Sequence, residues 1–281
     1  MLCWFDSHCH FDFSVFDSER DAIWQHCKSL NIGGMIIPGV SRQQSDVATA
    51  LVPGWPWYLG FGLHPYFLQQ HVPQDWQWLE NRVHAESGQN VVKEYSEGKS
   101  TTGAPVAVGE CGLHFTRTTS GPERTQQQAL FEFQVALARD NNLPMILHGV
   151  GAHDQIAATL NRMNCHTGGV VHAFSGSYQQ ACRYLDMGLR LGIGATFFHA
   201  NAHKLRRTLA ALPREAVLIE TDAPDMVAPF WSGLYGPQAI PMIALGLSSL
   251  WRIPLYELQQ QLWLNLMASF PLIAVQHTRI C

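Results

Sequence analysis

Short apolar runs recur along the chain and alternate with longer amphipathic segments. Runs of this length with little internal polarity are typical of parallel strands buried on both faces, whereas the segments between them have helical character. The predicted strands lie at residues 3–10, 34–40, 57–63, 106–110, 145–148, 169–172, 190–195 and 217–221. Eight strands, each followed by a helix, predict an α/β fold of the TIM (β/α)8 barrel type.

The helices between these runs carry their own end signals. The segment 19–30 is one helix, and 122–140 is another, with Thr119 or Ser120 as its cap and Pro122 in its first turn. Residues 86–103 interrupt the alternation, because they are polar and rich in Ser, Gly, Glu, Lys and Thr. They predict an exposed insertion. With no linker or repeat in view, we expect one domain over residues 1–281.

Several apolar runs end abruptly in a residue that binds metal ions. His8 and His10 are two positions apart on an extended segment, so both side chains point to one face. A buried imidazole or carboxylate without a partner is costly, and the carboxyl ends of barrel strands meet at one mouth. We therefore predict a metal site built by six residues: His8, His10, Glu110, His148, His172 and Asp222.

Six ligands suit two ions better than one. We expect His8, His10, Glu110 and Asp222 around one ion and Glu110, His148 and His172 around the other, with Glu110 as the bridge. Nitrogen and oxygen ligands without thiolate fit Zn, Mn, Fe or Co and admit Mg. Many barrel hydrolases use a carboxylated lysine as bridge, but none of the four lysines, Lys28, Lys93, Lys99 and Lys204, ends a strand.

Composition limits the partners and the compartment. The 281 residues carry a net charge of −4, so no general basic field attracts nucleic acid. Seven cysteines without a paired framework predict free thiols in a reducing compartment. The start does not have the pattern of a signal peptide, and no apolar stretch reaches the roughly 18 residues of a membrane span. We expect a cytoplasmic protein, with a monomer favoured and no organic cofactor.

Six ordered motifs carry a resemblance to a known family. They are Asp6-Ser7-His8-Cys9-His10-Phe11-Asp12, Gly62-Leu63-His64-Pro65, Val108-Gly109-Glu110-Cys111-Gly112-Leu113, Pro144-Met145-Ile146-Leu147-His148, Val171-His172-Ala173-Phe174-Ser175-Gly176-Ser177 and Glu220-Thr221-Asp222-Ala223-Pro224-Asp225. Over nearly its whole length the chain resembles the TatD family of metal-dependent deoxyribonucleases, and most of all its YjjV branch. The resemblance implies an amidohydrolase-like barrel, two divalent cations and hydrolysis of phosphodiester bonds in DNA. It also implies that Asp222 is the catalytic general base.

Other polar residues near the predicted mouth have open roles. His64 follows the third strand. It either contacts the substrate or the metal ligands, or it has a structural role. The same two roles are open for His153, whose structural role would be that of a residue on a surface helix. Asp6 precedes His8 and either supports it or forms a structural hydrogen bond at the strand end.

The chain departs from the family pattern at three places. His114 stands where relatives usually have Asp, which removes a carboxylate and adds a ligand or a cation. No Arg follows His148, and the stretch 234–241 lacks the Arg and Glu of relatives. Because Arg binds phosphate in two places at once, these losses favour alternatives. One is the same chemistry on a small phosphoester, amide or lactone. Another is an inactive metal-binding barrel that acts as a partner protein.

Overall fold

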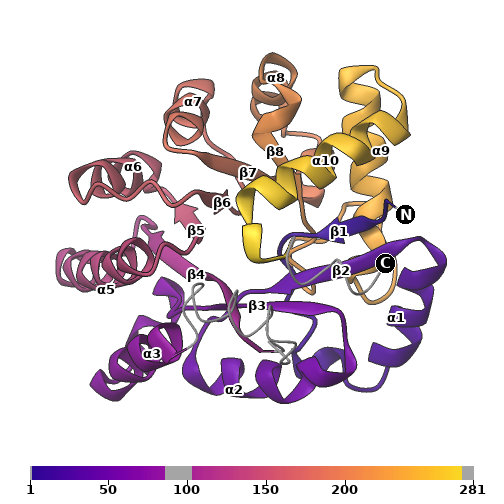
Figure 1. Cartoon of the computed structure of the whole chain (residues 1–281). Coiled ribbons are helices and arrows are strands. Elements are labelled where there is room, and N and C mark those ends of the chain that lie inside the picture. The colour runs from indigo at the N-terminus through magenta and orange to yellow at the C-terminus, as the bar shows by residue number, and fades with distance from the viewer. Residues whose placement is uncertain (1, 86–102, 274–281) are drawn as a thin grey trace.

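Eight parallel strands form one sheet in the order β1 to β8 in the computed structural model, which describes residues 2–85 and 103–273. Each strand pairs with the next in parallel register. The strands are β1 (Trp4–Asp6), β2 (Ile32–Ile37), β3 (Trp57–Phe61), β4 (Pro105–His114), β5 (Met145–Val150), β6 (Gly169–Val171), β7 (Leu189–Ile193) and β8 (Val217–Ile219). The predicted TIM barrel is confirmed (Figure 1).

Helices surround this sheet as an outer ring (Figure 1). They are α1 (Arg20–Ser29), α2 (Arg42–Leu51), α3 (Pro73–Ala85), α5 (Gly121–Asp140), α6 (His153–Arg162), α7 (Tyr178–Asp186), α8 (His203–Ala211), α9 (Ile240–Trp251) and α10 (Leu255–Ser269). The described residues also contain six short 3-10 turns: η1 (Ser14–Phe16), η2 (Val52–Gly54), η3 (Pro65–Gln70), η4 (Ala195–Phe198), η5 (Arg214–Ala216) and η6 (Pro237–Ala239). Both α9 and α10 contact β1 and β8, so they cover the junction of the first and last strands.

Local sequence explains where the longest helix begins and ends. The Ser120 hydroxyl accepts from the Glu123 backbone N–H, and the Glu123 carboxylate accepts from the Ser120 N–H, a capping box that starts α5. At the other end Asn142 has a positive φ of 50°, which reverses the chain before β5. Of the two predicted caps, Ser120 is the one used.

Backbone hydrogen bonds close the barrel between β8 and β1 at their carboxyl ends. The N–H of Ser7 donates to the carbonyl of Ile219 at 3.0 Å, and the N–H of Asp222 donates to the carbonyl of His8 at 2.9 Å. The N–H of His10 donates to the carbonyl of Ala223 at 2.9 Å. Residues more than 200 positions apart in sequence are thus held side by side.

Strand β4 extends beyond Glu110, so the prediction that this residue ends the strand was wrong. The strand continues to His114, which pairs with Val150, and β5 likewise continues past His148. Glycines allow β4 to approach β5 closely: a Cβ on Gly112, whose φ is +140°, would lie 2.1 Å from the carbonyl oxygen of His148. Glu110 therefore lies within β4, at the irregularity between Val108 and Cys111, and its backbone N–H donates to the carbonyl of Gly39 at 2.8 Å.

No single helix in the described ranges is long and apolar enough to cross a membrane; one pair, Pro237–Trp251 with Leu255–Ser269, passes that test jointly but is bent by 109°. Of the predicted insertion at 86–103, residues 86–102 lie outside the described residues.

Candidate metal centre

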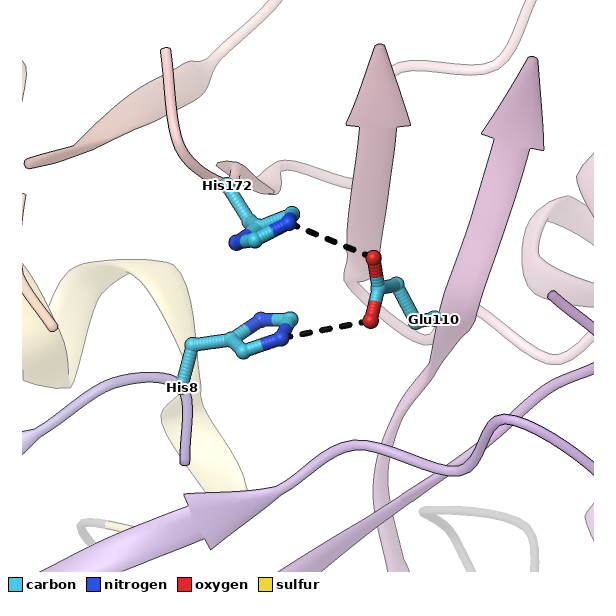
Figure 2. Close-up of side chains that lie close together, drawn as sticks. All are labelled: His8, Glu110 and His172. Carbon is cyan, nitrogen blue, oxygen red and sulfur yellow. Dashed lines mark ion pairs between the residues drawn. The ribbon is translucent and has the colours of Figure 1, made fainter. Parts of the chain in front are cut away.

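Glu110 lies between two groups of imidazoles at the mouth of the barrel. Its Oε2 lies 3.2 Å from Nε2 of His8, and its Oε1 lies 3.3 Å from Nε2 of His172. Figure 2 shows the two carboxylate oxygens turned towards these two rings. The His8 and His172 rings stack on each other, with centroids 3.9 Å apart. Each oxygen of one carboxylate therefore faces its own set of nitrogen atoms.

The Oε2 side of Glu110 gathers His8, His10 and Asp222. Oδ1 of Asp222 lies 3.3 Å from Nε2 of His8 and 3.6 Å from Nε2 of His10, and the latter lies 3.7 Å from Oε2 of Glu110. Ligands bound at 2.0–2.1 Å to a tetrahedral ion lie about 3.4 Å from one another. These four atoms have the spacing of one coordination sphere.

The Oε1 side of Glu110 gathers three imidazoles. Nδ1 of His148 lies at 2.9 Å, Nε2 of His64 at 3.0 Å and Nε2 of His172 at 3.3 Å. The structure thus brings together all six predicted ligands and adds His64, to which sequence reasoning assigned no ligand role. The available signal was its position just after β3, the same end of a strand at which the other residues lie.

Burial and mutual contacts set the protonation of these groups. Burial lowers the pKa of both His10 and His148 to about 4, so both imidazoles are neutral and free to coordinate. Burial acts to raise the pKa of Glu110, but the surrounding histidines outweigh it and hold that pKa well below its usual range. Asp222 is likewise lowered against its burial, by His172, His8 and His10. Both carboxylates are therefore ionised at neutral pH.

The donor set fits a divalent cation. Nδ1 of His8 and Nδ1 of His10 are buried without a hydrogen-bond partner in the described chain, which would cost free energy unless another group satisfied them. Three groups of side chains have ligand atoms within 4.8 Å of one another: His8–Glu110–His172, His8–His10–Asp222 and His64–Glu110–His148. All their donors are nitrogen or oxygen, the ligands of Zn and similar ions.

A buried acid supports one of these imidazoles. Oε1 of Glu220 lies 3.3 Å from Nδ1 of His172 and also accepts from the Ala173 backbone N–H, and there is room for it only because residue 192 is glycine. Carboxylates in this position orient metal-binding histidines. Sequence reasoning did not single out Glu220, although its place two residues before Asp222 on a buried segment was the signal.

Asp6 connects the two ends of the barrel behind His8. Its Oδ1 accepts from the backbone N–H groups of His8 and Thr221 at 3.2 and 3.0 Å, and its Oδ2 accepts from the Thr221 hydroxyl at 2.6 Å. Burial raises the pKa of Asp6 to about 7. Both roles considered for Asp6 therefore have contacts that fit them, since one hydrogen bond positions His8 and two join β1 to β8.

The other two histidines considered for substrate or ligand contact lie in different places. Nδ1 of His114 lies 2.9 Å from Nε2 of His148, with the two rings stacked, so His114 contacts a predicted ligand from behind. His153 lies at the start of α6, where its Nδ1 is 3.1 Å from the hydroxyl of Tyr184. None of the contacts described for His153 joins it to the six predicted ligands.

A cavity of about 480 Å³ opens beside the cluster. His148, His172 and Asp222 line it, as do residues of the connection from β7 to α8. This volume lies within the usual range for small-molecule sites. A ligand in this cavity would be in contact with both groups around Glu110.

A closed barrel with this donor set and an adjoining cavity defines a metal-dependent hydrolase. A sequence model described as TatD related DNase matches residues 5–271, and the chain belongs to the TatD family. The Escherichia coli "Uncharacterized metal-dependent hydrolase YjjV" is 34% identical over 273 residues, covering 96% of this chain and 99% of that protein. The "3'-5' ssDNA/RNA exonuclease TatD" of Pantoea ananatis is 31% identical over 227 residues, 79% of this chain and 80% of its own.

A solved structure shares both fold and sequence with this chain. The crystal structure of Escherichia coli YjjV superposes with a TM-score of 0.82 at 33% identity, over 96% of this chain and 99% of that one. The resemblance to the TatD family and its YjjV branch is confirmed.

Proposed function

We propose that this protein is a divalent-metal-dependent nuclease that hydrolyses phosphodiester bonds in DNA. The observation that carries the proposal is the position of Glu110, whose two oxygens face two separate groups of ligand atoms. Two ions held in this way suit the cleavage of a phosphodiester, in which both the attacking and the leaving oxygen need stabilisation. Relatives named as exonucleases acting on single-stranded DNA and RNA support this substrate class.

In this proposal His8, His10, Asp222 and Glu110 would hold one cation, and His148, His172 and Glu110 would hold the other. The ions, which are Zn, Mg or Mn, supply Lewis acidity and lower the pKa of a water molecule when bound. The protein holds the donors ready, because its strands fix each backbone and the buried acids Glu220 and Asp6 orient His172 and His8.

Asp222 serves as the general base. Its side chain is close to His8 and His10 and also lines the cavity, so it reaches both the cluster and the bound substrate. Its lowered pKa keeps it ionised, which allows it to accept the proton of the attacking water. In the described part of the chain the thiols of Cys9, Cys27, Cys111, Cys165 and Cys182 are free, which agrees with action in the cytoplasm, where DNA is available.

The test compares wild type with Asp222→Ala on single-stranded and duplex DNA, after loading with Zn, Mg or Mn in turn. We expect the variant to lose at least about 100-fold in rate, the lower end of what a general base contributes. Asp186→Ala, which removes an exposed acid at the end of α7, is the matched control and should cleave like wild type. Equal residual cleavage in wild type and Asp222→Ala would reject the proposal.

A second candidate keeps the chemistry and changes the substrate to a small phosphoester, amide or lactone. It is favoured by the size of the cavity and by its walls, which contain no arginine among the described residues. A panel of small esters, amides and lactones separates the two: turnover there without turnover of DNA selects this candidate.

A further inference from the structure

One lysine side chain adds a positive charge to the lining of the cavity. Lys204, in the first turn of α8, lines the cavity together with His199 and Asn201 from the preceding loop. It is the one lysine or arginine among the described residues that line this space, and Asp222 is the one acid. No ion pair between Lys204 and another described residue is present. The ammonium group is therefore available to a ligand.

The neighbouring arginine does not compete for such a ligand, because it holds the loop. The Arg206 guanidinium donates to the backbone carbonyls of Phe197, His199 and Ala200, at 2.8 to 3.1 Å. These bonds fix the segment that carries His199 and Asn201 against the start of α8. The wall that bears Lys204 is thus held in place by the protein itself before any substrate binds, which reduces the entropy lost on binding.

The lining of the cavity suits a ligand with more than one recognised group. The proposed ligands His148, His172 and Asp222 line it from β5 and from the residues that follow β6 and β8, whereas Lys204 lines it from α8. A cation that is not part of the proposed ligand set can bind another anion of the same molecule, and a polynucleotide supplies one at each neighbouring phosphate. The loop after His148 contains no cation, so α8 supplies what that loop lacks.

We propose that Lys204, with His199 and Asn201 beside it, binds a phosphate of single-stranded DNA next to the phosphate that is cleaved. This inference rests on the proposed nuclease function and names its substrate class. Lysine binds phosphate as a point charge without reading the base, so the contact adds affinity and register rather than sequence preference.

Binding to a short fluorescent oligothymidylate in EDTA, followed by anisotropy over a range of salt concentrations, tests the contact without cleavage. Losing one phosphate contact to a single strand lowers the slope of log affinity against log salt by about 0.7. We expect this smaller slope in Lys204→Ala and the wild-type slope in Lys204→Arg. Arg207→Ala removes an equal charge from the same helix but from outside the cavity, and should keep the wild-type slope.

Kinetics on two substrates separate this inference from the proposed function. Lys204→Ala should raise KM for the oligonucleotide about tenfold and leave kcat/KM for bis(4-nitrophenyl) phosphate, which has one phosphate, unchanged. Equal slopes in Lys204→Ala and Arg207→Ala, or wild type that does not bind the oligonucleotide, would overturn the Lys204 contact. Wild type that binds through Lys204 but cleaves no DNA would support the contact and reject the nuclease proposal.

Discussion

We expect a single glutamate to decide whether this site holds two ions or one. Glu110 is almost fully buried, and its oxygens divide the surrounding donors into two groups. A glutamine of the same size would keep one carbonyl oxygen and turn an N–H group towards the other set of imidazoles, where a cation would repel it. The negative charge that two ions would share would also be lost.

Glu110→Gln should therefore weaken the binding of both ions, and His10→Ala should weaken the binding of only one. Replacing a residue that only hydrogen-bonds to a metal ligand costs about 10- to 100-fold in metal affinity. For Glu110→Gln, which changes a ligand, we therefore expect affinity losses above about 100-fold at both metal sites. Metal analysis after dialysis should give two ions per chain in wild type, about one in His10→Ala and fewer than one in Glu110→Gln. Glu215→Gln, an exposed acid, is the control; two retained ions in Glu110→Gln would contradict the bridge.

His114 acts on His148 without being one of the predicted ligands. If His148 presents Nδ1 to a cation beside Glu110, its Nε2–H donates to Nδ1 of His114, which fixes the tautomer. We expect His114→Ala to lower metal affinity about 10- to 100-fold. His114→Asp should restore it, because a carboxylate accepts the same hydrogen bond.

Competition with a chelating dye measures this effect. His166→Ala removes an exposed histidine and should leave the affinity unchanged. Equal affinities in wild type and His114→Ala would show that the contact does not orient His148.

The sequence predicts some site residues better than others, for a physical reason. His148 and His172 directly follow apolar runs, so a strand alone places them at the mouth. His64 lies three residues past β3, and its position depends on a hydrogen bond from its N–H to the carbonyl of Val40 in another loop. In the sequence alone nothing distinguishes Lys204 from an ordinary helix residue, because only the closed barrel places α8 beside the cavity.

At the scale of elements, the strands were easier to predict than their ends. Apolar runs mark where a strand is buried, but its end depends on which partner continues the ladder. β4 passes Glu110 because β5 continues beside it to Val150, and glycines at 109 and 112 permit the close approach. A pattern along one segment does not contain this information about its neighbour.

A buried carboxylate between β1 and α2 makes stability depend on pH. Asp12 accepts a hydrogen bond from Gln44 through Oδ2, has no partner at Oδ1, and burial raises its pKa from 3.8 to about 7. Because the folded state binds the proton more tightly, the stabilising contribution is complete below about pH 4. It is lost as pH rises through 7.

Wild type should accordingly lose stability relative to Asp12→Asn by about 3 kcal/mol between pH 5 and pH 8. Urea unfolding of both proteins in EDTA measures the difference without a contribution from metal binding. Asp21→Asn, an exposed acid on α1, should show no such trend. A difference between wild type and Asp12→Asn that stays constant with pH would contradict the prediction.

At the scale of the whole molecule, the candidate metal centre brings together residues from six of the eight described strands. Its residues come from or directly follow β1, β3, β4, β5, β6 and β8, and three backbone hydrogen bonds between the ends of β8 and β1 complete the ring there. Because these donors converge only in the folded chain, any ion they bind favours the folded state.

Removing metal should therefore lower the melting temperature of the entire barrel in one step. An ion present at 100 times its Kd adds about 2.7 kcal/mol per site, which in a chain of this size corresponds to roughly 5–10 °C. Thermal unfolding followed by circular dichroism, in EDTA and then with increasing Zn or Mn, should show this rise. Glu110→Gln should show almost none of it, because the bridge serves both sites, whereas His10→Ala should show about half. A wild-type melting temperature that does not change with metal would mean that the donors do not bind an ion in the folded state.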